Sequence, residues 1–344
     1  MLQPKYTITN SLLANIKRVN FLVHELNNRR FPNIVLLELE RIAREVSSYA
    51  STSIEGNPLP LTEVKKILKL KPAHIRDSEK EVLNYNQALQ DLNNQLDKNA
   101  VRLSLDLILK IQKQVTEGLL PKFESGRLRE KPVVVNDPRT KQPVYLPPDV
   151  KDVKSLMEDL VKFINDAKGE IDPLILAAIF HKQMVIIHPF MDGNGRTTRL
   201  VTKALLAAMG LNTFNLFSFE NYYNQNVTKY FQTVGEFGNY YELFEKIDFS
   251  NWLEYFTEGI IDELLRVEKL LPKIAVSPET QLRPHHLKII EHIRKEGFIS
   301  DREYAALVNR AKATRTQDFK KLRELSLIER KGKGKATYYI LKEK

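Results

Sequence analysis

The chain of 344 residues is 42% hydrophobic and 28% charged, a composition typical of a globular protein large enough for one large domain and a small one. It contains no cysteine, which excludes disulfides and thiolate metal sites, and no apolar run is long enough to span a bilayer. The formal net charge is +10, and residues 283–344, with 17 Lys and Arg against 8 Asp and Glu, carry nearly all of it.

This concentration of positive charge predicts two modules with different partners. We expect an N-terminal helical region over 1–100, a core over 101–270, a linker over 271–284 and a small domain over 285–344. The first residues lack the apolar stretch of a signal peptide, so a cytoplasmic protein with no membrane partner is expected.

Apolar residues at helical spacing recur through most of the chain before residue 270. The helices that this spacing predicts are 10–31, 34–53, 78–96, 105–119, 153–167, 173–187, 196–209 and 249–267. Residues 126–148 differ, because two β-rich runs flank a turn cluster and predict a β-hairpin, which its prolines would keep at the edge of a sheet. The expected fold class is therefore mainly α, with a helical core and one β-hairpin.

The stretch 188–199, His-Pro-Phe-Met-Asp-Gly-Asn-Gly-Arg-Thr-Thr-Arg, follows a helix that is apolar on nearly every face and is therefore expected to be buried. Pro189 cannot extend that helix and pushes His188 out of the α region, so His188 is expected at the exposed end of the helix. An imidazole at such a position is a natural general base near neutral pH.

The same stretch carries the parts of a polyphosphate site. Residues 193–195 form a glycine loop that opens the next helix, which points free N–H groups and the positive end of the helix dipole at an anion. Arg196 and Arg199 are three residues apart and lean over that anion from one face of the helix. Asp192 offers a hard oxygen ligand of the kind that binds Mg²⁺ beside phosphates.

The stretch resembles the Fic family signature, His-x-Phe-x-(Asp/Glu)-Gly-Asn-Gly-Arg-x-x-Arg, at every defined position. Fic proteins are mostly nucleotidyltransferases that move AMP from ATP to a protein Ser, Thr or Tyr hydroxyl. The resemblance therefore implies an ATP-dependent protein adenylyltransferase with a Fic-type helical core, in which His188 deprotonates the target hydroxyl and Asp192 holds Mg²⁺. The nucleotide-binding residues that it implies are Gly193, Asn194, Gly195, Arg196, Arg199, Asn226 and Tyr230. UMP or GMP transfer stays open.

A second motif ends the helix expected over 34–53. Ser51, Glu55 and Gly56 resemble the family's inhibitory motif, (Ser/Thr)-x-x-x-Glu-(Gly/Asn), placed N-terminal to the catalytic motif. The helix dipole disfavours a carboxylate at a C-terminal end, so Glu55 needs another reason to be there. A pairing of Glu55 with Arg199 would keep the γ-phosphate from that guanidinium, and the resemblance implies an autoinhibited enzyme that can modify itself. In the alternative reaction, Glu55 orients a water for removal of AMP.

Residues 126–148 stand where the family carries its flap. Val144, Tyr145 and Leu146 would dock the protein target as an added strand and leave its hydroxyl near His188.

In relatives an Asn and a Tyr pair lie near the ribose and the adenine. Asn226 with Tyr230 fits that spacing, and Tyr240 with Tyr241 is the competing alignment.

The basic residues 285–344 read as three helices, over 286–296, 299–308 and 313–325, followed by a strand, a basic glycine-rich turn and a strand. This order resembles a winged helix-turn-helix domain. The residues available for phosphate contacts are Arg315, Lys320, Lys321, Lys331, Lys333 and Lys335. Duplex DNA and a second copy of the chain are therefore further candidate partners. The competing function is a DNA-binding regulator whose Fic body senses nucleotide.

Overall fold

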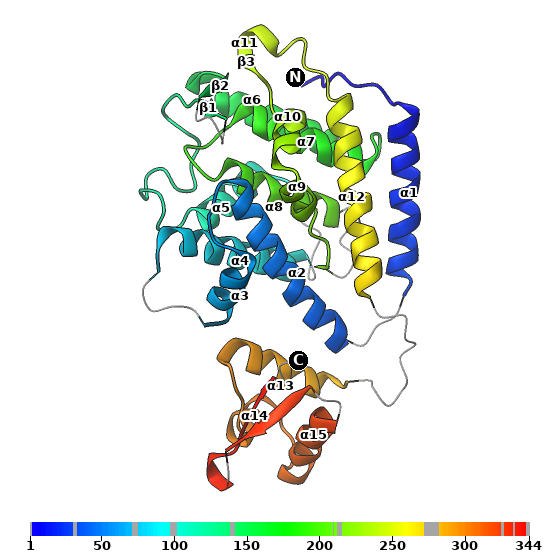
Figure 1. Cartoon of the computed structure of the whole chain (residues 1–344), viewed down its shortest axis with the longest axis vertical. Helices are drawn as coiled ribbons and strands as arrows, with labels where there is room; N and C mark the ends of the chain where they lie inside the picture. The colour runs from blue at the N-terminus through cyan, green and yellow to red at the C-terminus, as the bar shows by residue number, and fades with distance from the viewer. Residues whose placement is uncertain are drawn as a thin grey trace. The chain divides into compact units, whose positions relative to one another are not determined.

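The computed structural model describes residues 2–29, 33–70, 75–96, 102–137, 142–208, 210–211, 215–271, 282–324, 327–332 and 334–341. The chain divides into two compact units, Met1–Arg29 with Leu39–Pro272 and Arg30–Glu38 with Lys273–Lys344 (Figure 1). Most of the expected linker (272–281) and the turn of the hairpin (138–141) lie outside the described residues. No helix in the described ranges is long and apolar enough to cross a membrane.

Helices make up most of the first unit, which confirms the mainly α fold class. They are α1 (Asn10–Asn27), α2 (Asn33–Ile54), α3 (Leu61–Leu70), α4 (Asp77–Leu96), α5 (Leu105–Val115), α6 (Val150–Asp166), α7 (Pro173–Ile187), α8 (Asn194–Ala208), α9 (Glu220–Gln225), α10 (Val227–Val234), α11 (Tyr240–Leu243) and α12 (Ser250–Leu270). Every helix that the apolar spacing predicts is present. The short helices α3, α9, α10 and α11 were not predicted.

Side-chain caps explain where several of these helices begin. The side chains of Thr9, Ser104 and Asp172 each accept a hydrogen bond from a backbone N–H in the first turn of α1, α5 and α7. Asp172 is followed by proline at the first helical position, where the missing N–H has no partner to lose. The start of α7, the helix that ends at the motif, is therefore encoded locally.

Helices α7 and α8 lie at the centre of the first unit. α8 packs against α7, α5 and α4, while α12 packs against α7 and α1. Leu174 to Met184 of α7 are all buried, and so are nearly all residues of α8 up to Leu206. The loop that joins the two helices therefore leaves the core directly, as the apolar pattern of α7 predicts.

The hairpin is part of a larger sheet than the sequence predicts. Strands β1 (Val135–Asn136) and β2 (Pro143–Leu146) pair antiparallel, and β3 (Gly238–Asn239) pairs parallel with β2. The strand order β1-β2-β3 places β1 at the edge of the sheet and makes β2 the central strand, so the hairpin lies at the edge through β1 alone. Pro143 is tolerated because it is the first residue of its strand. A target could not add as a strand to β2 along Tyr145 and Leu146, where β3 already pairs.

The second unit contains α13 (Pro284–Glu296), α14 (Asp301–Leu307), α15 (Lys312–Glu324), β4 (Ile328–Lys331) and β5 (Tyr338–Leu341), with a 3-10 turn at Gly334–Ala336. β4 and β5 pair antiparallel, from Ile328 opposite Leu341 to Lys331 opposite Tyr338. The buried core of the unit is formed by Ile289, Ile290, Ile293, Ile299, Tyr304, Phe319, Leu322 and Ile328. The unit thus has the three helices and two strands expected from the sequence.

Candidate active site

His188 ends α7 in a left-handed backbone conformation, with φ 48° and ψ 60°. It has thus left the right-handed α region, as the following proline predicts. Its Nδ1 lies 3.4 Å from the carbonyl oxygen of Val185. Burial lowers the pKa of His188 to about 4, although the Val185 carbonyl and the Glu55 carboxylate oppose that shift. The imidazole is therefore neutral at physiological pH, and a proton on Nδ1 leaves Nε2 free to accept one.

The loop after His188 is closed by the side chain of Asn194. Its Oδ1 accepts the N–H of Phe190 at 2.9 Å, and its Nδ2 donates to the carbonyl of Phe190 at 2.9 Å. Phe190 is fully buried, so it anchors the loop to the core. Asn194 consequently offers a ligand its backbone, because its amide side chain is already bonded. Gly193 has φ +78°, and a Cβ there would lie 2.8 Å from the methyl group of Thr116.

Arg199 is fully buried and bonded to the end of α2. Its Nε donates to Ser51 Oγ at 2.8 Å, and its Nη2 donates to the Ser51 carbonyl at 2.8 Å and to Glu55 Oε1 at 2.7 Å. Burial opposes the charge, but the Glu55 carboxylate raises the pKa of Arg199 above its ordinary value. Ser51 and Glu55 lie 148 and 144 residues before Arg199 in the sequence. The two motifs therefore meet at this guanidinium.

Gly195 makes room for that contact. A Cβ at this position would lie 1.9 Å from Glu55 Oε1 and 2.9 Å from Arg199 Nη1. Any other residue at 195 would therefore collide with the docked carboxylate. Nη1 of Arg199 is buried and has no hydrogen-bond partner.

Arg196 is also buried and paired with acidic side chains. Its Nη2 lies 3.0 Å from both carboxylate oxygens of Asp192, and its Nη1 lies 3.4 Å from Glu81 Oε1. Glu81 is held in turn by Asn57, whose Nδ2 donates to Oε2 at 2.7 Å. The Nε and Nη1 atoms of Arg196 make no hydrogen bond. Sequence reasoning missed Glu81, because an acid on a helix surface carries no local signal of a distant arginine.

A buried polar network behind Arg199 was also missed. Ser47 Oγ donates to Ser218 Oγ at 2.7 Å and accepts from Lys203 Nζ at 3.2 Å. Lys203 Nζ lies 3.6 Å from Oε1 of the fully buried Glu220, which also accepts from Tyr85 OH at 2.7 Å. α2 thus places Ser47, Ser51 and Glu55, four residues apart, against Arg199 and Lys203, four residues apart on α8.

His181 has a structural role in the core. It is fully buried, its Nδ1 lies 3.1 Å from Thr202 Oγ1, and its Nε2 lies 3.0 Å from Tyr230 OH. Thr202 donates its own proton to the Thr198 carbonyl, so its oxygen accepts from Nδ1–H of His181. Burial, with a contribution from Arg199, keeps the pKa of His181 well below its ordinary value.

Tyr230 and Asn226, the two residues expected to contact the nucleoside, differ in exposure. Tyr230 is 1% exposed, and burial raises its pKa to about 12 against the effect of Arg199. Its hydroxyl faces His181, so it lines the core next to Arg199 in this conformation. Asn226 is exposed, and its Oδ1 caps α10 by accepting the N–H of Lys229 at 3.0 Å. A nucleotide contact by either residue stays a prediction.

The flap residues also differ in exposure. Tyr145 is buried and donates to the carbonyl of Ile186 in α7 at 3.1 Å, so it anchors the flap to the core. Leu146 is 45% exposed and Val144 is partly exposed. Of the three residues expected to contact a target, Val144 and Leu146 therefore present side-chain surface.

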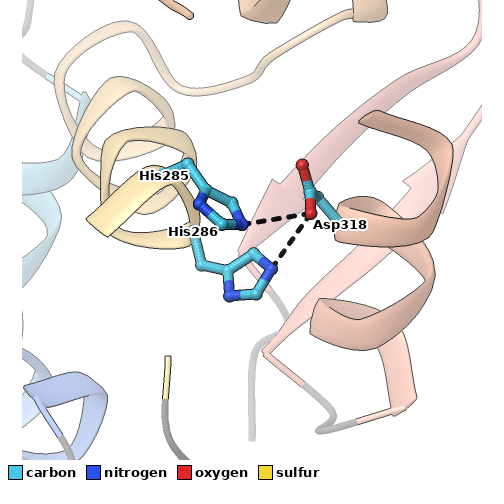
Figure 2. Close-up of side chains that lie close together, drawn as sticks. All are labelled: His285, His286 and Asp318. Carbon is cyan, nitrogen blue, oxygen red and sulfur yellow. Dashed lines mark hydrogen bonds and ion pairs between the residues drawn. The ribbon is translucent and has the colours of Figure 1, made fainter. Parts of the chain in front are cut away.

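In the second unit, His285, His286 and Asp318 gather at one point (Figure 2). Nε2 of each histidine lies 3.2 Å from Asp318 Oδ1. Nδ1 of His286 accepts the backbone N–H of Arg283 at 3.1 Å, and Nδ1 of His285 lies 3.5 Å from Nη1 of Arg310. A histidine that accepts at Nδ1 carries its proton on Nε2 and donates it to Asp318, so these nitrogens are not free for a metal ion. The cluster is a hydrogen-bonded part of the core.

Comparison with known proteins agrees with this geometry. Residues 102–206 match the Fic/DOC family model. The chain is 34% identical over 166 residues to Protein adenylyltransferase Fic of Nematostella vectensis, and 34% identical over 180 residues to Protein adenylyltransferase fic-1 of Caenorhabditis elegans. These matches cover 47% and 50% of this chain and 37% and 34% of the relatives. The chain thus spans little more than a third of the curated relatives that it matches.

Solved structures share the fold. A Fic family protein from Desulfovibrio desulfuricans G20 has a TM-score of 0.64 at 21% identity, over 100% of this chain and 99% of that one. Fic-1 from C. elegans has a TM-score of 0.60 at 25% identity, over 75% of this chain and 72% of that one. The helical fold and the complete motif at 188–199 agree with the family match, so residues 102–206 contain a domain similar to those of the Fic/DOC family.

Proposed function

We propose that the chain is an ATP-dependent protein adenylyltransferase, held in an autoinhibited state by Glu55. The observation that carries this proposal is the state of Arg199, which is fully buried and bonded to Glu55 Oε1 at 2.7 Å while its Nη1 has no partner. The relatives named protein adenylyltransferase support the reaction, because they match the part of the chain that holds the motif.

The unpartnered guanidinium atoms support a phosphate ligand. Nε of Arg196 and Nη1 of Arg199 are buried donors without a hydrogen bond, and Nη1 of Arg196 has only an ion pair with Glu81 Oε1 at 3.4 Å. Each such donor costs about 1–3 kcal/mol when it stays unpaired, so a ligand that supplies anionic oxygens would recover that free energy. The first turn of α8, which begins at Asn194, adds backbone N–H groups at the same place.

Asp192 fits the role of a Mg²⁺ ligand, because its carboxylate is 48% exposed and stands beside the phosphate site. In this structure the carboxylate is paired with Arg196, so binding of ATP would separate the two. Mg²⁺ would neutralise phosphate charge when bound. The carboxylate of Asp192 and the guanidinium donors of the two arginines are the groups of this chain that would orient the triphosphate.

The transfer then follows from the position of His188. Its neutral Nε2 accepts the proton of a target Ser, Thr or Tyr hydroxyl, and the hydroxyl oxygen attacks the α-phosphorus of ATP. The bond from the α-phosphorus to the bridging oxygen breaks, and pyrophosphate leaves. The product is a phosphodiester between AMP and the target. Val144 and Leu146 of the flap are proposed to contact the target, and hydroxyls of the chain itself are proposed as one set of acceptors.

Intact mass after incubation with ATP and Mg²⁺ tests the proposal. We expect little change in the unaltered protein, a gain of one or more AMP in the Glu55→Gly variant, and none in the Glu55→Gly/His188→Ala double variant. UTP and GTP in parallel identify the donor. Incorporation that does not require His188 would contradict the assignment of the base, and no incorporation by Glu55→Gly with any of these nucleotides would overturn the proposed transfer onto the chain itself. Release of AMP from the labelled protein by the unaltered chain would favour the reverse reaction.

We propose a second activity for the C-terminal unit, namely binding of duplex DNA by a winged helix. Lys312 and Arg323 are exposed on one face of α15, within a segment of high positive charge. Arg315 is not available as expected, because it is paired with Asp301 at 2.8 and 2.9 Å. Lys333 and the side chain of Lys335 lie outside the described residues.

Fluorescence polarisation of a labelled duplex at several salt concentrations tests DNA binding by the full chain. Replacement of Lys312 and Arg323 by Ala should weaken binding and reduce the slope of log K against log salt by about 2. Lys288→Ala, at an exposed position of α13, is the matched control. Equal slopes in all three proteins would exclude α15 as the DNA contact.

A further inference from the structure

Arg129 is a buried arginine beside the catalytic loop that no acidic side chain neutralises by an ion pair in the described structure. It is 3% exposed. Its Nε donates to the carbonyl of His188 at 2.9 Å, and its backbone N–H donates to the carbonyl of Pro189 at 2.8 Å. Its Nη2 donates to the carbonyl of Pro148, and its Nη1 donates to that of Lys131 at 3.3 Å. One side chain thus bonds three separate backbone segments.

The His188 carbonyl is a group at a helix end that lacks a donor within its own helix. The last carbonyl groups of a helix have no donor within it, and the left-handed turn at His188 directs its carbonyl away from α7. A planar guanidinium with donors on three nitrogens suits carbonyls that diverge in this way. Burying its charge costs free energy, and this burial lowers the pKa of Arg129 from its ordinary value. Such a cost is tolerated where the charge fixes a geometry.

The segments that Arg129 joins have different roles. Pro148 ends the flap segment after β2 and precedes α6, whereas His188 and Pro189 are the start of the motif. The flap is also bonded to α7 by Tyr145, through the carbonyl of Ile186. The root of the flap and the carbonyl of the base are therefore held by one guanidinium.

We propose that Arg129 is a positioning residue, which fixes the backbone of His188 and couples it to the root of the flap. It touches neither the nucleotide site nor Nε2 of His188 in the contacts described, so it acts through the backbone of the base. The inference rests on the proposed transfer reaction. In that reaction a base displaced by about 1 Å can cost on the order of 100-fold in rate.

The test uses the Glu55→Gly background, in which the nucleotide site is released. The first-order rate of self-labelling is measured against ATP concentration, which gives a maximal rate and the ATP concentration for half of that rate. Arg129→Ala should lower the maximal rate about 100-fold and leave the half-saturating ATP concentration within about 3-fold. Arg129→Lys, which keeps the charge but loses the diverging donors, should recover only part of the rate. Arg127→Ala, an exposed arginine two residues away, is the matched control.

Thermal unfolding of each variant shows whether it folds. If Arg129→Ala does not fold, the rates of Arg129→Lys are used for the comparison instead. An unchanged maximal rate in a folded Arg129 variant overturns the inference, and so does a loss equal to that in Arg127→Ala. Failure of Glu55→Gly itself to incorporate nucleotide counts against the proposed function instead. The imidazole ¹⁵N resonances of His188 then test the inference without activity. They should shift in Arg129→Ala and not in Arg127→Ala, and identical resonances in both variants would overturn it.

Discussion

Arg199 makes its hydrogen bonds to Ser51 and Glu55, and these bonds must rearrange before a γ-phosphate can reach the guanidinium. The proposed inhibitory contact therefore does not depend on Glu55 alone. Ser51 supplies two of the acceptors, one from its hydroxyl and one from its backbone. At the scale of single residues, Arg199 is held by three hydrogen bonds, one to the Glu55 carboxylate and two to neutral acceptors of Ser51.

Ser51→Ala should consequently weaken the closed state. It leaves Nε of a fully buried arginine without an acceptor, which costs about 1–2 kcal/mol in the docked form. Self-labelling of the otherwise unaltered protein should rise about 5-fold to 30-fold in an assay with labelled ATP. Ser53→Ala, on the same turn of α2, provides the control. A labelling rate for Ser51→Ala equal to that of Ser53→Ala would show that the hydroxyl does not contribute.

The pH dependence of transfer follows from the pKa of His188. The base is active when neutral, and burial sets its pKa at about 4, so activity should be lost only as the pH falls through about 4. The Glu55 carboxylate raises this pKa, and Glu55→Gly should move the acid limb lower still. The maximal labelling rate of Glu55→Gly should therefore be flat between about pH 5 and 8. An acid limb near the ordinary histidine pKa would contradict the buried, neutral base.

At the scale of elements, the paired faces of α2 and α8 explain how a helix with several serines can dock inside a core. Ser47 and Ser51 face Lys203 and Arg199, and the fully buried Glu220 lies behind them. Buried polar groups of this kind are stable only when each has a partner. The docked position of α2 is thus specified by hydrogen-bond geometry as well as by apolar packing.

A double-variant cycle tests this arrangement. Lys203→Met leaves the Glu220 carboxylate buried without its cation, and the free energy of unfolding should fall by about 3 kcal/mol. Lys203→Met with Glu220→Gln removes both charges and should regain most of that loss. Urea denaturation of the two single variants and the double variant gives the coupling. Strictly additive effects would mean that the two side chains do not interact energetically.

The elements that could be predicted from the sequence have local signals, whereas those that were missed depend on contacts with distant parts of the chain. α7 is encoded by its Asp172-Pro173 start, its apolar residues and Pro189 after its end, all of which are local signals. β3 has two residues, and it is a strand only because β2 lies beside it. The same holds for Glu81, whose pairing with Arg196 depends on how α4 packs against α8. The pairing of Glu55 with Arg199 was predicted because both residues lie in recognisable motifs, whereas Glu81 and β3 lie in no such motif.

At the scale of the whole molecule, the two units have separate cores, and the second contains a cluster that is sensitive to acid. Asp318 accepts from His286, from Tyr304 OH at 2.8 Å and from Arg310 at 3.0 Å. Burial lowers the pKa of His286 to about 4, and neighbouring His285 contributes. The unfolded form binds more protons than the folded form between the ordinary histidine pKa and about 4, so stability is lost as the pH falls through this window.

Hydrogen exchange of the full chain should show this loss locally. Peptides from α13 and α15 should lose protection, after correction for intrinsic rates, between about pH 6.5 and 4. Peptides from α12 should change less. His286→Asn should remove most of the pH dependence at a lower overall protection. Protection of α13 and α15 that is independent of pH would show that His286 does not charge on unfolding in this window.

In this structure the Asp192 and Glu55 carboxylates bind Arg196 and Arg199, the two guanidinium groups that are proposed to bind the triphosphate. On the proposed function, ATP would replace these carboxylates when it binds. Its apparent affinity would be the intrinsic affinity multiplied by the fraction of molecules from which Glu55 has departed. ADP, which lacks the γ-phosphate, does not compete for Arg199. The resting protein should thus select poorly between ADP and ATP, while Glu55→Gly should prefer ATP, which calorimetric titration with each nucleotide can measure. On the proposed function, Glu55 would thus set the nucleotide preference of the site as well as the rate of transfer.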